Sequence, residues 1–366
     1  GVGSFAQVWL GTKKSTGDVY AIKAIRKKSS AGDLAGDLPA LNIEHTILEK
    51  HTCDFLVRGY FSFESAQHTY FVTEYLAGGE LRTMLQCCGF LDEDTTRFYT
   101  CEIIEGMRYL HDNHLLHRDI KPSNVLITAS GHAKLTDFGL CSSVNHINNS
   151  GTLPYAAPEV LTGGVPSAAL DFYSLGVFIF ELLQGYLPFS LENRNSMSAV
   201  EASRAMLARI TSSRPNYNGM SDVARTLIEG LLEFDPLKRL GAEAVRGQRW
   251  FDGVQWDSLL AQPAPFLPEL SGETDTSFFR EVSQTDLLPF DVSDSDPGAP
   301  IVPPHAPAIS MWQSPQRMSG VAGFDNLINK SALSAPSTPL INKQADTANK
   351  ANRADKAPEV LAAATR

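Results

Sequence analysis

The stretch HLLHRDIKPSNVLI occupies residues 114–127, and KLTDFG follows it at residues 134–139. Three more short motifs flank this pair: GVGSFAQV at residues 1–8, VYAIK at residues 19–23 and YAAPE at residues 155–159. GVGSFAQV alone is weak evidence, because Gly-x-Gly is common in surface turns. VYAIK adds a lysine, Lys23, to an otherwise apolar strand, where a cation requires an anionic partner. Five motifs in this order and at this spacing are not expected by chance.

Together the motifs resemble those of a eukaryotic protein kinase over about residues 1–252. The resemblance implies a bilobal α+β fold, with a β-rich N-lobe at residues 1–76, its first strand missing, and a helical C-lobe at residues 77–252. The periodicity agrees, since short β-type runs fill the first 75 residues and apolar residues then recur at intervals of three and four up to about residue 250.

The same resemblance implies the residues of phosphoryl transfer, a reaction that depends on charge neutralisation and in-line positioning. Lys23 would contact the α- and β-phosphates of ATP, and Asn124 and Asp137 would bind Mg²⁺ through oxygen. Asp119 would accept the proton of the substrate hydroxyl, and Lys121 would lie beside the transferring phosphate and favour serine or threonine substrates. The nucleotide contacts implied by position are Gly1, Gly3, Val8, Ala21, Lys23, Glu74, Leu76, Glu80, Leu126 and Thr136.

Two glutamates of the N-lobe helix, Glu44 and Glu49, compete as the partner of Lys23. The sequence around the two glutamates favours Glu49, because it resembles that of the cyclic-nucleotide-dependent kinases. Spacing favours Glu44, because Glu49 leaves too few residues for the helix to end before FLVRGYFSF, the next expected strand. Glu44 also places Leu48 one turn later, where an apolar residue must pack behind Phe138. We therefore predict Glu44.

The C-terminal part resembles the AGC group of kinases in APFLPELSGETDTSFF at residues 264–279. This sequence is most similar to the tails of the Rho-associated, citron and myotonic-dystrophy-type kinases. The resemblance implies a tail over residues 253–292 that returns to the N-lobe and brings Phe279 to the ATP site; an acidic linker is the alternative. Residues 293–366 hold nine prolines and few aromatic residues, so we expect them to be disordered.

Substrates with basic residues upstream of the phosphoacceptor are implied by Glu80 and Glu181, although Glu80 has an alternative role at the ATP ribose. The activation segment departs from the family: Asn148 stands where a phosphothreonine is common, and Ser142 and Ala40 replace two cationic residues that would hold its phosphate. Only Arg118 remains of that cluster. We therefore expect activity that does not need phosphorylation of this segment.

Composition sets limits on the remaining function classes. A formal net charge of −10 argues against a general nucleic-acid binder, and no apolar run is long enough for a membrane span. Five cysteines without metal-ligand spacing fit reduced thiols in the cytoplasm or nucleus. A Rossmann enzyme is excluded by the lack of a βαβ pattern after the glycines. A catalytically inactive pseudokinase scaffold remains as the alternative, and the regulatory partners are unknown.

Overall fold

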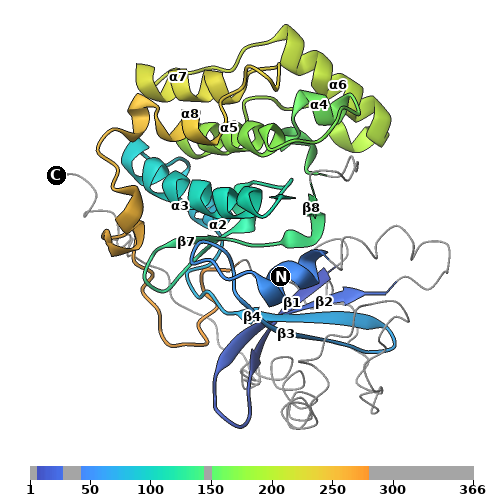
Figure 1. Ribbon diagram of the computed structural model, residues 1–366, viewed down its shortest axis with the longest axis vertical. Coiled ribbons are helices and arrows are strands. Elements are labelled where there is room, and N and C mark those ends of the chain that lie inside the picture. Colours follow the sequence, from blue (N-terminus) through green and yellow to red (C-terminus); the bar gives the residue numbers. More distant parts are fainter. Residues whose placement is uncertain (1–5, 28–42, 144–150, 280–366) are drawn as a thin grey trace, which may run out of the picture.

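The computed structural model describes residues 6–27, 43–143 and 151–279. The chain forms two lobes, a β-sheet lobe at the bottom of Figure 1 and a helical lobe above it, so the expected bilobal α+β fold is confirmed. Gly1, Gly3 and the segment 293–366 lie outside the described residues, and the domain boundaries stay predictions.

The N-lobe is a four-stranded antiparallel sheet in the order β1-β2-β4-β3. Its strands are β1 (Ala6–Thr12), β2 (Val19–Arg26), β3 (Gly59–Glu64) and β4 (His68–Glu74). Tyr20, Ile22 and Ala24 are buried on one face of β2, which leaves Ala21 and Lys23 on the other. Val8 lies directly opposite Lys23, so its side chain shares this second face. A helix over residues 43–50 belongs to the same lobe.

The segment FLVRGYFSF, expected to be one strand, is divided between the two lobes. β3 begins only at Gly59, where a Cβ atom would lie 2.3 Å from the carbonyl oxygen of Leu48. Before that point, Val57 donates its N–H to Leu135 and Leu135 donates its own to Phe55, over 2.8 and 2.9 Å. The first residues of the segment therefore pair with the C-lobe, and the close approach at the glycine allows the chain to change direction.

The C-lobe is built around α5 (Ala169–Gln184), which is buried from Leu170 to Leu183. Gly176 lets α7 (Asp222–Leu231) approach closely, because a Cβ there would lie 2.8 Å from Cβ of Leu231. Among the described residues, no helix is both long and apolar enough to cross a membrane. The other helices are α2 (Leu81–Cys88), α3 (Glu93–Asp112), α4 (Pro158–Leu161), α6 (Ala199–Ser212), α7 (Asp222–Leu231) and α8 (Ala242–Arg246). Short strands pair as β5 (Leu115–Leu116) with β8 (Ser142–Ser143) and β6 (Val125–Ile127) with β7 (Ala133–Leu135).

The tail descends from the helical lobe to the sheet lobe, as the orange segment in Figure 1. It passes so close to the connection between the lobes that a Cβ on Gly79 would lie 2.1 Å from the carbonyl oxygen of Phe278. Gly79 also has a positive φ of 77°, so glycine is favoured there on two grounds.

Candidate active site

Lys23 joins three elements at one point. Its Nζ lies 2.7 Å from Glu44 Oε1 in the N-lobe helix and 2.7 Å from Asp137 Oδ1, which follows β7 in the C-lobe. Burial would lower the pKa of Lys23, but the two carboxylates outweigh it and raise that pKa above its ordinary value. Burial would likewise raise the pKa of Asp137, and the charge of Lys23 reverses that shift. Lys23 is therefore a fixed cation and Asp137 a fixed anion.

The geometry agrees with Glu44 rather than Glu49 as the partner of Lys23. Glu44 is buried beside the lysine, whereas the Glu49 carboxylate lies 3.5 Å from His45 Nδ1 on its own helix. Leu48 packs against the apolar cluster that contains Phe138, as the spacing argument required.

Asp119 is the centre of a second group of polar contacts. Its Oδ2 accepts hydrogen bonds from Lys121 Nζ at 2.6 Å and from Asn124 Nδ2 at 2.8 Å. Its Oδ1 accepts one from the hydroxyl of Thr152 at 2.7 Å, and Lys121 Nζ lies 2.7 Å from the same hydroxyl. A hydroxyl donor therefore fits against Asp119, which is the contact that a general base makes with an alcohol.

Asp171, at the start of α5, fixes the loop that carries Asp119. Its carboxylate accepts the backbone N–H groups of His117 and Arg118 at 2.9 and 2.7 Å and contacts His111 Nε2 at 2.8 Å. Burial would raise the pKa of Asp171, but the hydrogen bond with His111 and those from the backbone lower it. Through these contacts Asp171 anchors the loop, and the contribution of His111 was not expected from the sequence.

The donor set of Asn124 and Asp137 suits a hard divalent cation. Both residues leave the same end of the β6–β7 hairpin, where Thr136 N–H donates to the carbonyl oxygen of Asn124 over 3.0 Å. The amide nitrogen of Asn124 donates to Asp119, which leaves its amide oxygen as the donor for a metal. Oδ1 of Asp137 contacts Lys23, which leaves Oδ2 as the oxygen for a metal.

The residues expected to contact adenine and ribose lie along the sheet and the connection after it. Ala21 on β2 is paired with Thr73 on β4, and Leu126 forms an isolated antiparallel β-bridge with Glu80. Leu76 is buried in the connection. The side chain of Glu74 accepts hydrogen bonds from Lys134 Nζ and Arg58 N–H at 2.7 and 2.8 Å, both at Oε1.

The tail adds side chains to this region. Tyr75 donates its hydroxyl hydrogen to the carbonyl oxygen of Asp275, and its ring stacks with that of Phe279 at a centroid separation of 5.8 Å. Phe279 therefore lies beside the connection between the lobes, in agreement with the expected course of the tail. Tyr75 was missed, because its partner is 200 residues away and no local pattern marks it.

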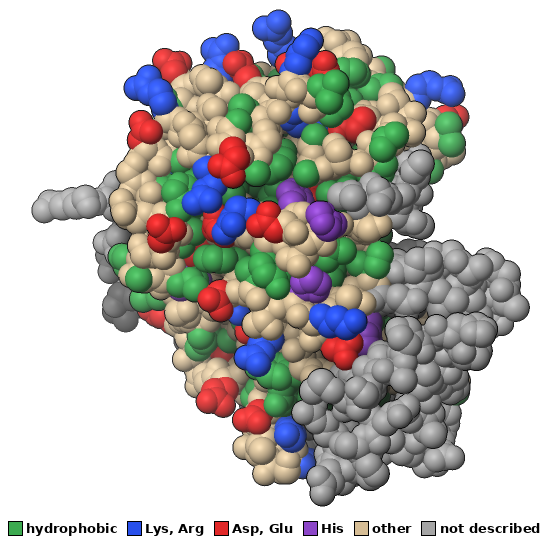
Figure 2. Space-filling view, viewed as in Figure 1, with side chains coloured by type: hydrophobic (Ala, Val, Ile, Leu, Met, Phe, Trp, Pro, Cys, Tyr) green, Lys and Arg blue, Asp and Glu red, His purple; other side chains and the backbone are tan. Residues whose placement is uncertain are grey.

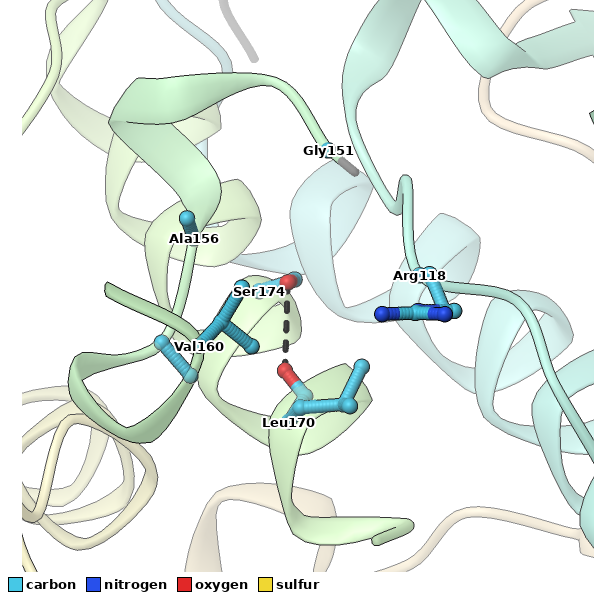
Figure 3. A pocket seen from close by; sticks show the side chains of 7 residues that line it. Arg118, Gly151, Ala156, Val160, Leu170 and Ser174 are labelled. Carbon is cyan, nitrogen blue, oxygen red and sulfur yellow. Dashed lines mark hydrogen bonds between the residues drawn. The ribbon is translucent and has the colours of Figure 1, made fainter. Parts of the chain in front are cut away.

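Arg118 lies under the activation segment. It is 5% exposed and donates from Nη1 to Ser142 Oγ over 3.1 Å. Its Nε and Nη2 are buried without a hydrogen-bond partner in the described part of the chain, and Figure 3 shows the guanidinium pointing into a small pocket. Burial lowers the pKa of Arg118. Asn148 and Ala40 lie outside the described residues, so phosphate-independent activity stays a prediction.

The two acids expected to recognise basic substrates differ in their surroundings. Glu181, in α5, is 2% exposed and already bonded to Arg82 and to the hydroxyl of Tyr155. Glu80 is half-buried, and burial raises its pKa while the charges of Arg82 and Lys121 oppose that shift. On the face shown in Figure 2, basic and acidic side chains are interspersed over the helical lobe.

Comparison with known proteins finds one matching family and several similar protein kinases. The family described as Protein kinase domain matches residues 1–251. Probable serine/threonine protein kinase IRE4 of Arabidopsis thaliana is 36% identical over 314 residues, covering 76% of this chain and 29% of that protein. Serine/threonine-protein kinase SCH9 of Saccharomyces cerevisiae is 36% identical over 291 residues, covering 76% and 34%. The RAC family serine/threonine-protein kinase homolog of Dictyostelium discoideum is 35% identical over 286 residues, covering 76% and 62%.

These matches confirm the recognition made from the motifs, including the AGC group, while the closer likeness of the tail to the Rho-associated type stays a prediction. The chain spans about a third or less of the length of the IRE4 and SCH9 proteins. Within the described residues, no feature favours the inactive pseudokinase alternative. The chain belongs to the protein kinase family, and its relatives are serine/threonine protein kinases.

Proposed function

We propose that this chain transfers the γ-phosphate of ATP to serine or threonine hydroxyls of proteins, with Mg²⁺ as the metal ion. The observation that carries the proposal is the position of Lys23, whose Nζ is 2.7 Å from both Glu44 and Asp137. This contact brings a phosphate-binding cation of the N-lobe to a metal-binding carboxylate of the C-lobe. Phosphoryl transfer needs these charges held in fixed positions.

Each residue has one role in this proposal. Lys23 binds the α- and β-phosphates, and Glu44 orients it. Asn124 and Asp137 hold Mg²⁺, which when bound neutralises charge on the phosphates. Asp119 orients the substrate hydroxyl and accepts its proton, and Lys121 stabilises the transferring phosphate. Val8, Ala21 and Leu126 enclose the adenine, the backbone of Glu74 and Leu76 pairs with its edge, and Thr136 positions the metal-binding loop.

We further propose that the substrates carry basic residues upstream of the phosphoacceptor. The support is the acidic character of Glu80 and of Glu181, the acid that binds Arg82. A reducing compartment, the cytoplasm or nucleus, fits the five free cysteines.

The test is phosphorylation of a serine peptide library with radiolabelled ATP. Asp119→Asn and Asp137→Asn should each lower kcat/KM by about a hundredfold or more, since a positioned base or metal contributes on that order. Asp94→Asn is the matched control, because Asp94 is an exposed carboxylate at the start of α3 whose side chain is 86% exposed. Chelation of Mg²⁺ should abolish transfer. Equal activity of Asp137→Asn and the unmodified chain, or transfer that survives chelation, would refute the proposal.

A further inference from the structure

Glu181 is a buried carboxylate with both oxygens occupied by the chain itself. Arg82 forms an ion pair with Oε1, and the Tyr155 hydroxyl donates to Oε2. The side chain of Glu181 is 2% exposed and that of Arg82 is 39% exposed. A buried carboxylate requires a cation or strong donors, and here an arginine from α2 provides the charge.

This ion pair lies next to the proposed phosphoacceptor position. Tyr155 donates its N–H to the carbonyl oxygen of Thr152 over 2.9 Å, and Thr152 contacts Asp119. Arg82 also follows Glu80 by only two residues. Arg82 therefore pairs with Glu181, one of the two acids that would otherwise receive arginines from a substrate, and its charge also acts on the other, Glu80.

We propose that Arg82 is a specificity-determining residue that occupies the arginine subsite at Glu181 from within the chain. The inference rests on the proposed function. A substrate arginine can reach Glu181 only by displacing Arg82, and replacing one arginine–carboxylate pair by another gains almost nothing. Selection for basic residues is then left to Glu80, and one of the two upstream arginines contributes little.

Removal of Arg82 should release the second subsite. In Arg82→Ala, the carboxylate of Glu181 loses its charged partner, and an incoming guanidinium would form a charge-assisted hydrogen bond in its place. Such a bond corresponds to a preference of about tenfold or more. The gain should require the negative charge of Glu181.

The experiment uses four serine peptides that carry arginine two residues upstream, three residues upstream, at both positions or at neither. In the unmodified chain, adding a second arginine to a peptide that already carries one should change kcat/KM by less than about twofold. This is the result expected when a substrate arginine merely replaces Arg82 at Glu181. In Arg82→Ala the second arginine should raise kcat/KM by about tenfold, and the double variant Arg82→Ala, Glu181→Gln should lose this gain. For each variant, kcat/KM is divided by its value for the peptide without arginine, and this ratio separates selectivity from a general loss of activity.

Arg108→Ala is the matched control. Arg108 is 43% exposed and pairs with the buried Glu105 over 2.7 Å, on α3 rather than α2. Its removal should leave the peptide preferences unchanged. Unchanged preferences in Arg82→Ala, or the same gain in Arg108→Ala, would overturn the proposal.

Two further measurements keep the result decisive. Arg82→Gln retains a polar but uncharged and shorter side chain and should show the same gain if Arg82→Ala does not fold. Calorimetric binding of the two-arginine peptide with alanine at the phosphoacceptor position needs no turnover. It should show tighter binding to Arg82→Gln than to the unmodified chain. Failure of phosphorylation with this binding difference intact would refute the proposed function alone, and equal binding to both would refute the role of Arg82.

Discussion

The pH dependence of stability should be governed in part by Glu102, which ties β7 to α3. Glu102 is fully buried, its Oε2 accepts the N–H of Ala133 at 2.6 Å, and its Oε1 lies 2.5 Å from His132 Nδ1. Burial raises the pKa of Glu102 from 4.5 to about 7, although the contacts with Ala133 and His132 oppose the shift. Because β7 leads directly to Asp137, this contact supports the proposed metal-binding loop.

The sign follows from proton linkage. Between about pH 4.5 and 7 the folded chain holds a proton on Glu102 that the unfolded chain has lost, so the free energy of unfolding falls as the pH rises through this window. A shift of about 2.5 pKa units corresponds to about 3 kcal/mol, most of which is lost between pH 5 and pH 8.

Glu102→Gln removes the titration but keeps the shape. The amide oxygen can accept the N–H of Ala133, and the amide nitrogen can donate to His132. The free energy of unfolding of the variant, measured relative to that of the unmodified chain, should rise by about 2 to 3 kcal/mol as the pH is raised from 5 to 8. Urea unfolding at four pH values measures this difference, and Glu243→Gln, on the exposed surface of α8, is the control. A difference between Glu102→Gln and the unmodified chain that stays constant from pH 5 to 8 would refute the reasoning.

Three further predictions concern the active site. Glu44→Gln should lower kcat/KM in peptide phosphorylation by about tenfold or more, whereas Glu49→Gln should leave it nearly unchanged; equal losses would contradict the pairing with Lys23. Asp171→Asn should lower kcat more than KM, since an amide oxygen replaces a carboxylate that holds two backbone N–H groups; a melting-temperature scan tests whether folding is kept. Protein shown by mass spectrometry to lack phosphate on Ser142, Ser143 and Ser150 should remain active, and activity restored only by phosphorylation of one of them would contradict this.

The sequence predicts best those residues of the candidate site at which the proposed chemistry allows only one type of side chain. Lys23, Asp119 and Asp137 lie in short motifs, and the structure joins Lys23 to Asp137 and Asp119 to Lys121 and Asn124 of its own motif. The choice of Glu44 needed one further physical argument, the length of helix that fits before the next strand, and the geometry agrees with it.

Other contacts could not be predicted because neither partner carries a local signal. Arg82 and Glu181 are 99 residues apart, and each alone resembles an ordinary surface arginine or a substrate-binding acid. Glu102 reads as an exposed position in a helix, and its burial depends on where the β6–β7 hairpin packs. The early residues of FLVRGYFSF have the β-branched and aromatic composition of a strand, but composition does not specify which lobe they pair with.

The backbone itself shows where function overrides local preference. Arg118 and Asp137 have positive φ angles of 70° and 63°, a conformation that costs an ordinary residue roughly 1 kcal/mol or more. Glycine would remove this cost but also the side chain. The positive φ conformation of Arg118 is stabilised by Asp171, which accepts its backbone N–H. The carboxylate of Asp137 accepts a hydrogen bond from Lys23 of the opposite lobe. Each strained residue is thus bonded to a charged partner from a distant element, within the C-lobe for Arg118 and across the two lobes for Asp137.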